Sequence, residues 1–101
     1  MALEAIVVNV EKGLEDLIPV FMAQRKADQS AIATALPQRD FEALRKIGHG
    51  MEGAGTSYGF ERISELGEQL TKAARAGDIA ALSAIKSALD DFMSRLVVNY
   101  M

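Results

Sequence analysis

Apolar residues recur at helical spacing along most of the chain, in four separate segments. Such a stripe predicts an amphipathic helix with one buried face. We expect helices over about residues 13–35, from Asp40 to about residue 58, from about residue 60 to Gly77, and from Asp78 to about residue 96. In order, the stripes contain Leu14, Leu17, Ile18, Phe21, Met22, Ile32 and Leu36; Phe41, Leu44, Ile47, Met51 and Tyr58; Ile63, Leu66 and Leu70; and Ile79, Leu82, Ile85, Leu89, Phe92 and Leu96.

Residues that start and stop helices lie between these stripes. Asp40 and Asp78 are good N-caps, and Gly77 is a typical C-terminal residue. Pro19 lies inside the first segment, so that helix either begins at Ile18–Pro19 or is kinked there. Because the connections are short, consecutive helices should be antiparallel neighbours. The pattern therefore predicts an all-α fold, an up-down antiparallel four-helix bundle.

The start of the chain follows a different pattern. Residues 5–10 are rich in β-branched side chains, which favour extended structure. We expect residues 1–12 to form a short extended N-terminal arm of a single domain that spans residues 1–101. Residues 6–10 and 97–98 either supply an apolar patch for dimerisation or pair with each other as packed ends. We expect a monomer, although the sequence alone leaves both possibilities for these residues open.

Composition removes several classes of function. The 101 residues carry a net charge of -3, the wrong sign for a protein that binds nucleic acid or an anionic membrane. No apolar run approaches the roughly 20 residues that span a bilayer, and no signal peptide opens the chain. There is no cysteine and only one histidine, so a zinc or iron site would need carboxylates almost alone. We expect a cytoplasmic protein without a metal or other cofactor.

The stretch GHGMEGAG, residues 48–55, places four glycines and that one histidine inside the second helix. Each glycine costs a helix roughly 1 kcal/mol relative to alanine, so this stretch needs a compensating role. On a helical wheel, Gly48 and Gly55 lie on the buried side, where they let a neighbouring helix approach. Gly50 and Gly53 lie near His49, which points about 155° away from the middle of the apolar stripe. We expect an exposed imidazole with open space around it.

From the residues alone, two interpretations of His49 remain. It is either an incidental surface histidine or a nucleophile that receives a group from a partner macromolecule. No serine and carboxylate in the local sequence indicate a catalytic relay. No phosphate-binding loop of the GxxxxGK[ST] kind and no kinase signature occurs, so the chain should neither bind ATP nor phosphorylate itself.

At this point the chain resembles the histidine phosphotransfer (Hpt) domain of two-component phosphorelays, and in particular small bacterial stand-alone members. Their pattern is a phosphorylated histidine followed by a hydrophobic residue two positions on, lysine at three, glycine at four and a second glycine at ten. His49, Met51, Gly53 and Gly59 fall on those offsets, and the resemblance extends over essentially the whole chain. The stretch Ser57-Tyr58-Gly59-Phe60 also resembles the S/G-Y-G-F sequence that ends this helix in one subgroup of the family.

The resemblance implies a carrier, not an enzyme. His49 would accept a phosphoryl group, most readily on Nε2, and exchange it with the aspartate of a receiver domain. The acidic pocket and Mg²⁺ would belong to that partner, and a hybrid sensor kinase is the other partner class. Both contacts would be transient. Arg45, Glu52 and Gly53 are expected around the phosphoryl group, and Lys46, Gly50 and Thr56 in the docking surface.

One position departs from the family pattern. Glu52 stands where the family usually has lysine, on the same helix face as His49. A carboxylate about 6 Å from a phosphoryl dianion costs roughly tenfold in an equilibrium in water, before screening. Arg45 and Lys46 would partly replace the missing positive charge.

Three alternatives stay open. The first is that the protein is an Hpt-like docking or regulatory module that is never phosphorylated, because Glu52 replaces the usual lysine. A carboxylate metal bundle would need inward Glu-x-x-His pairs, whereas this chain has Lys46 three residues before its single histidine. The third is a structural helical protein that dimerises through the apolar patch.

Overall fold

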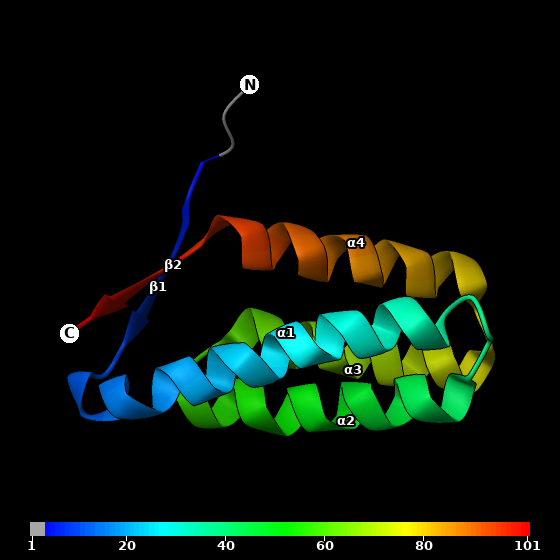
Figure 1. Ribbon diagram of the computed structural model, residues 1–101, viewed down its shortest axis with the longest axis horizontal. Helices are drawn as coiled ribbons and strands as arrows, with labels where there is room; N and C mark the ends of the chain where they lie inside the picture. The colour runs from blue at the N-terminus through cyan, green and yellow to red at the C-terminus, as the bar shows by residue number, and fades with distance from the viewer. Residues whose placement is uncertain (1–3) are drawn as a thin grey trace.

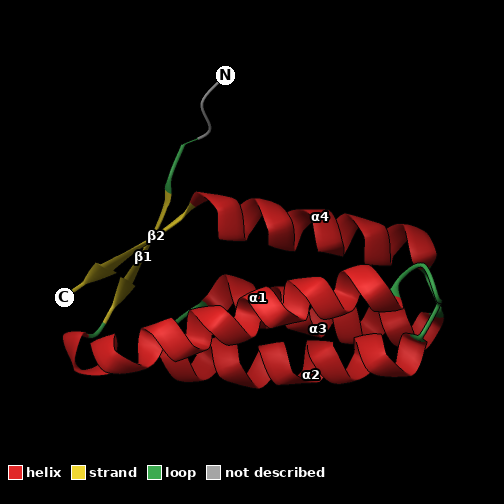
Figure 2. Cartoon of the chain, viewed as in Figure 1, coloured by secondary structure: helices red, strands yellow, loops and turns green. Residues whose placement is uncertain are grey.

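Residues 4–101 are described by a computed structural model, in which four α-helices lie beside a two-stranded sheet (Figures 1 and 2). The elements in chain order are β1 (Ile6–Val10), the short 3-10 helix η1 (Lys12–Leu17), α1 (Ile18–Ala35), α2 (Phe41–Tyr58), α3 (Glu61–Ala76), α4 (Ile79–Arg95) and β2 (Leu96–Tyr100). Figure 1 shows α1 and α3 lying between α2 and α4.

The helix boundaries follow the capping residues. The side chain of Asp40 accepts a hydrogen bond from the backbone N–H of Ala43 at 3.1 Å, and Asp78 accepts one from Ala81 at 3.0 Å. Gly77 ends α3 with a left-handed φ of 64°, which glycine adopts without strain. These three predictions are confirmed.

Helix α1 begins at Ile18, with Pro19 in its first turn, so a start at Ile18–Pro19 is correct and a longer helix from residue 13 is wrong. The preceding residues form η1 instead. The placement of Leu17 on the buried stripe is also wrong, because 46% of this residue is exposed. Leu17 ends a 3-10 helix, which has three residues per turn, so the spacing of the α-helical stripe does not apply to it.

The core is formed by apolar side chains from all four helices and from β1. It contains Val10, Ile18, Phe21, Ile32, Ala35, Leu44, Met51, Phe60, Ile63, Leu66, Leu70, Ala73, Ala74, Leu82, Ile85, Leu89 and Phe92. Most of these residues were expected from the stripes. Their burial holds α2 against α3 and leaves the other face of α2 in solvent.

The all-α prediction is incomplete, because β1 and β2 pair in parallel. Val7 lies opposite Val97, and Asn99 Nδ2 donates a hydrogen bond to Asn9 Oδ1 at 3.0 Å. The expected extended arm therefore contains strand β1, and pairing of the two ends, one of the two possibilities left by the sequence, is what the structure shows. The fourth helix also ends earlier than expected: Leu96 has the extended angles φ -66° and ψ 129°, and it begins β2.

Candidate functional site

The glycines of residues 48–55 separate into two groups, as the helical wheel predicts. A Cβ on Gly48 would lie 2.6 Å from Thr71 Oγ1 and 2.7 Å from the carbonyl oxygen of Gly67, both on α3. A Cβ on Gly55 would lie 2.5 Å from the backbone nitrogen of Ser64. These two glycines therefore let α2 and α3 approach backbone to backbone.

The other two glycines face open space. A Cβ on Gly50 or on Gly53 would meet nothing within 4 Å. Neither position needs glycine for packing or for a positive φ, since both lie inside α2 with ordinary helical geometry. Their effect is to leave two positions on the exposed surface near the middle of α2 without a side chain.

His49 lies in that uncrowded surface. The residue is exposed, as expected, and it borders a shallow hollow of about 410 Å³ lined by His49, Glu52, Gly53 and Thr56. This hollow is open to solvent, so an imidazole placed there can be reached by another molecule.

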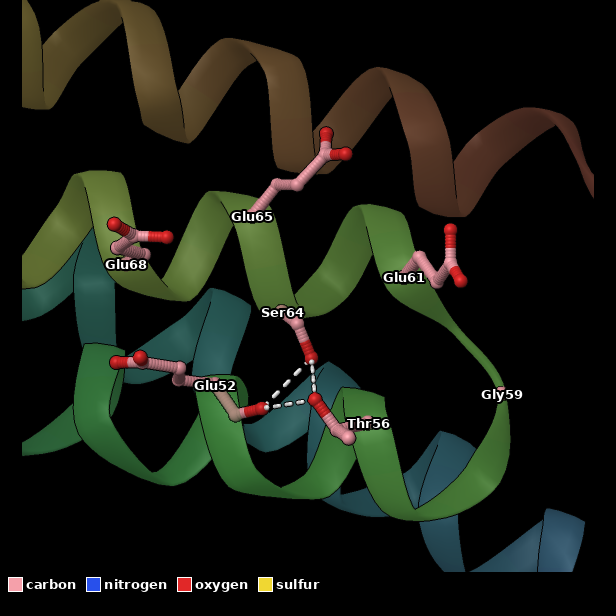
Figure 3. Close-up of a pocket in the computed structure, with 7 residues that line it drawn as sticks. All are labelled: Glu52, Thr56, Gly59, Glu61, Ser64, Glu65 and Glu68. Atoms are coloured by element: carbon pink, nitrogen blue, oxygen red, sulfur yellow. Dashed lines mark hydrogen bonds between the residues drawn. The ribbon is translucent and has the colours of Figure 1, made fainter.

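A second hollow continues from the first across the junction of α2 and α3. It has a volume of about 410 Å³ and shares Glu52 and Thr56 with the hollow at His49. The remaining lining residues are Gly59, Glu61, Ser64, Glu65 and Glu68. Figure 3 shows Glu52 and Glu68 at one end of this acidic groove and Gly59 and Glu61 at the other. No pattern in the sequence predicts the residues that α3 contributes to this groove.

Hydroxyl groups fix the floor of the acidic groove. Ser64 Oγ donates to the backbone carbonyl oxygen of Glu52 at 2.7 Å, and Thr56 Oγ1 donates to the same oxygen at 3.3 Å (Figure 3). The two hydroxyl oxygens lie 2.9 Å apart. These bonds tie α3 to the turn of α2 that follows His49.

Comparison with known proteins decides the family. The model of the Hpt domain matches residues 16–98, which is most of the chain and includes the whole site. The chain belongs to the Hpt domain family. No curated protein and no solved structure matches it.

Membership of the Hpt family implies a histidine phosphotransfer role in phosphorelays, as a phosphocarrier and not a catalyst. Hpt domains interact with receiver domains and with kinases. Within residues 4–101, no helix combines the length and the apolar character that crossing a membrane requires.

The two basic residues expected near His49, Arg45 and Lys46, differ in whether an acidic side chain already binds them in this Hpt domain. Arg45 lies one turn before His49, but its guanidinium binds Glu42, with Nη2 2.7 Å from Oε1 and Nε 3.1 Å from Oε2. This hydrogen-bonded pair raises the pKa of Arg45 and lowers the pKa of Glu42. Lys46 is exposed on the solvent face. Of the two, Arg45 is already engaged with an acidic side chain.

A third cation comes from α3. Lys72 Nζ lies 2.9 Å from Glu68 Oε1, and the two side chains are 73% and 53% exposed. The hydrogen bond and charge of Glu68 raise the pKa of Lys72, and the charge of Glu52 adds to that shift. Lys72 is therefore near enough to Glu52 for the two charges to interact, although no sequence pattern pointed to this lysine.

For the acidic groove to bind a metal ion, as the alternative of a carboxylate metal bundle would need, its side chains would have to be suitably arranged. Among residues 4–101, no group of three or more His, Asp and Glu side chains is arranged to hold a metal ion. In that part of the chain, the carboxylates of the groove are surface charges spread along α2 and α3.

Proposed function

We propose that His49 is the residue that carries the phosphoryl group, and that it exchanges this group with the aspartate of a receiver domain. The observation that carries the proposal is an exposed imidazole in the middle of α2, next to Gly50 and Gly53, which leave it uncrowded. It is the only histidine in a chain that belongs to the Hpt family.

The chemistry asks little of this chain beyond an accessible nucleophile. The lone pair of Nε2 in a neutral imidazole attacks phosphorus, and the P–O bond to the aspartate of the partner breaks. An N–P bond forms, the carboxylate leaves, and the ring proton stays on Nδ1. Transfer of this kind depends mostly on positioning the two proteins. The Mg²⁺ and the acidic pocket belong, in this proposal, to the receiver domain.

The docking surface surrounds His49 on α2. Lys46, Gly50 and Thr56 are exposed around it, and Gly50 and Gly53 leave room for the active-site loops of the partner. We propose a modest and transient contact, because a relay intermediate must release each partner in turn. A monomeric up-down antiparallel bundle suits this use, and the short loops between consecutive helices support that connectivity.

The test is a phosphotransfer assay with a phosphorylated receiver domain, run on wild-type protein and on His49→Gln. We expect acid-labile, base-stable label on the wild type and none on the variant. The helical circular dichroism of the two proteins should be nearly identical, because the substituted side chain is exposed. Full labelling of a folded His49→Gln protein would show that another residue accepts the phosphoryl group.

A further inference from the structure

None of the residues that line the hollow at His49, apart from the histidine itself, can carry a positive charge. Glu52, one turn after His49, brings a negative charge to the position where the family usually has lysine. Arg45, one turn before His49, is bound by both carboxylate oxygens of Glu42. A phosphoryl dianion on His49 would therefore meet the carboxylate of Glu52 on one side, and the already paired guanidinium of Arg45 and the exposed Lys46 on the other.

The contact between α2 and α3 determines which residues of α3 lie level with His49. Gly48 meets Thr71, the backbone of Glu52 meets Gly67, and Gly55 meets Ser64. Extending this antiparallel register, His49 is level with residue 70 of α3. Glu68 and Lys72 then lie on either side of that level, each about 3 Å away along the helix axis.

The two side chains also lie on the correct flank of α3. Glu68 lines the acidic groove together with Glu52 (Figure 3). Because Glu52 also lines the hollow at His49, Glu68 lies on the flank of α3 that faces the His49 side of α2. Lys72 is bound to Glu68 one turn further along that flank. The contribution of Glu52 to the raised pKa of Lys72 independently supports this proximity. Because glycines line the contact, the helices lie close enough for a lysine side chain to span between them.

We propose that Lys72 holds the phosphoryl group on His49, exchanging its ion pair with Glu68 for one with the phosphoryl oxygens. Lys72 thereby supplies from α3 the positive charge that residue 52 of α2 does not. This inference rests on the proposed function of His49. The exchange is favourable because an exposed lysine–glutamate pair is weak, whereas the phosphoryl group offers up to two negative charges.

The test uses chemical phosphorylation by phosphoramidate, so that no receiver domain is needed. The fraction of phosphohistidine at equilibrium is measured by ³¹P NMR for wild type, Lys72→Ala and Glu68→Gln. Removing one positive charge about 6 Å from a dianion should lower the equilibrium constant roughly three- to tenfold. Glu68→Gln frees Lys72 from its partner and should raise that constant about twofold.

The matched control is Lys86→Ala, which removes a lysine from an ion pair of the same i,i+4 spacing on α4. It should leave phosphorylation unchanged. The deficit of Lys72→Ala should also shrink in about 1 M salt, where charges are screened beyond roughly 3 Å, whereas a merely structural defect would persist. Equal phosphorylation of wild type and Lys72→Ala would overturn the role of Lys72 alone. No phosphorylation of the wild type under any condition would overturn the role of His49 as well.

Discussion

At the scale of single residues, the four glycines within residues 48–55 of α2 have two different roles. Gly48 and Gly55 pack directly against α3, whereas Gly50 and Gly53 face solvent. The helical wheel predicted this division because it depends only on the spacing within one helix. It could not predict the contribution of Lys72 or Ser64, because the register between α2 and α3 is set by packing that no local pattern encodes.

Alanine substitutions distinguish the two kinds of glycine. Gly50→Ala should stabilise the protein by about 0.5–1 kcal/mol, because alanine favours the helix and its Cβ meets nothing. Gly48→Ala should destabilise it by about 1–3 kcal/mol, because its Cβ would collide with the backbone of α3. Urea unfolding followed by circular dichroism measures both. A destabilised Gly50→Ala protein would mean that the surface at His49 is packed and not open.

At the scale of elements, the helix ends marked by capping residues were the most predictable part of the fold. Asp40, Asp78 and Gly77 act through their own turns, so their positions are readable from the sequence. Leu17 was misplaced because a 3-10 helix interrupts the expected spacing. The side-chain bonds between helices were not predictable. One of them joins α1 to α4: Gln29 Nε2 donates to Asp90 Oδ1 at 2.9 Å.

Asp90 should make this connection dependent on pH. Burial raises the pKa of Asp90, but the bonds from Lys86 and Gln29 outweigh it and bring the pKa below its ordinary value of 3.8. A carboxyl whose pKa is lowered by folding adds stability above its unfolded pKa, and this stability is lost as the pH falls through the lower, folded pKa.

Asp90→Asn should therefore be less stable than wild type at pH 7 by at most about 1 kcal/mol, since the side chain is 40% exposed. The difference should narrow as the pH falls below about 3.8, the ordinary pKa of the carboxyl. Urea unfolding at pH 7 and at pH 3 measures it. A difference that is the same at both pH values would exclude the charge of Asp90 as its source.

At the scale of the whole molecule, the site lies on the closely packed pair α2 and α3, and the two ends of the described chain meet in a small sheet elsewhere. Pairing of the ends was one of two possibilities left by the sequence. The β-branched residues indicated extended structure, but whether distant strands pair depends on where α1 and α4 place them. The parallel register of Val7 with Val97 was for that reason not predictable.

Hydrogen exchange should show this division. A two-stranded sheet is only marginally stable in water, so the amides of β1 and β2 should exchange through local opening. The amides of α2 and α3 should be protected nearly to the global free energy of unfolding, because the backbones of these two helices pack directly against each other. Mass spectrometry of exchanged peptides measures both. Equal protection throughout would mean that the sheet opens only with the whole fold.

The central claim is that the ring of His49 bears the phosphoryl group, and NMR of the protein phosphorylated by a receiver domain tests it most directly. Phosphorus on Nε2 should couple to both carbon-bound ring protons, Hδ2 and Hε1, since this nitrogen lies between the two carbons. We expect both couplings, from the single histidine of the chain. Loss of the phosphoryl group from the receiver domain without any coupling to the His49 ring would contradict the account.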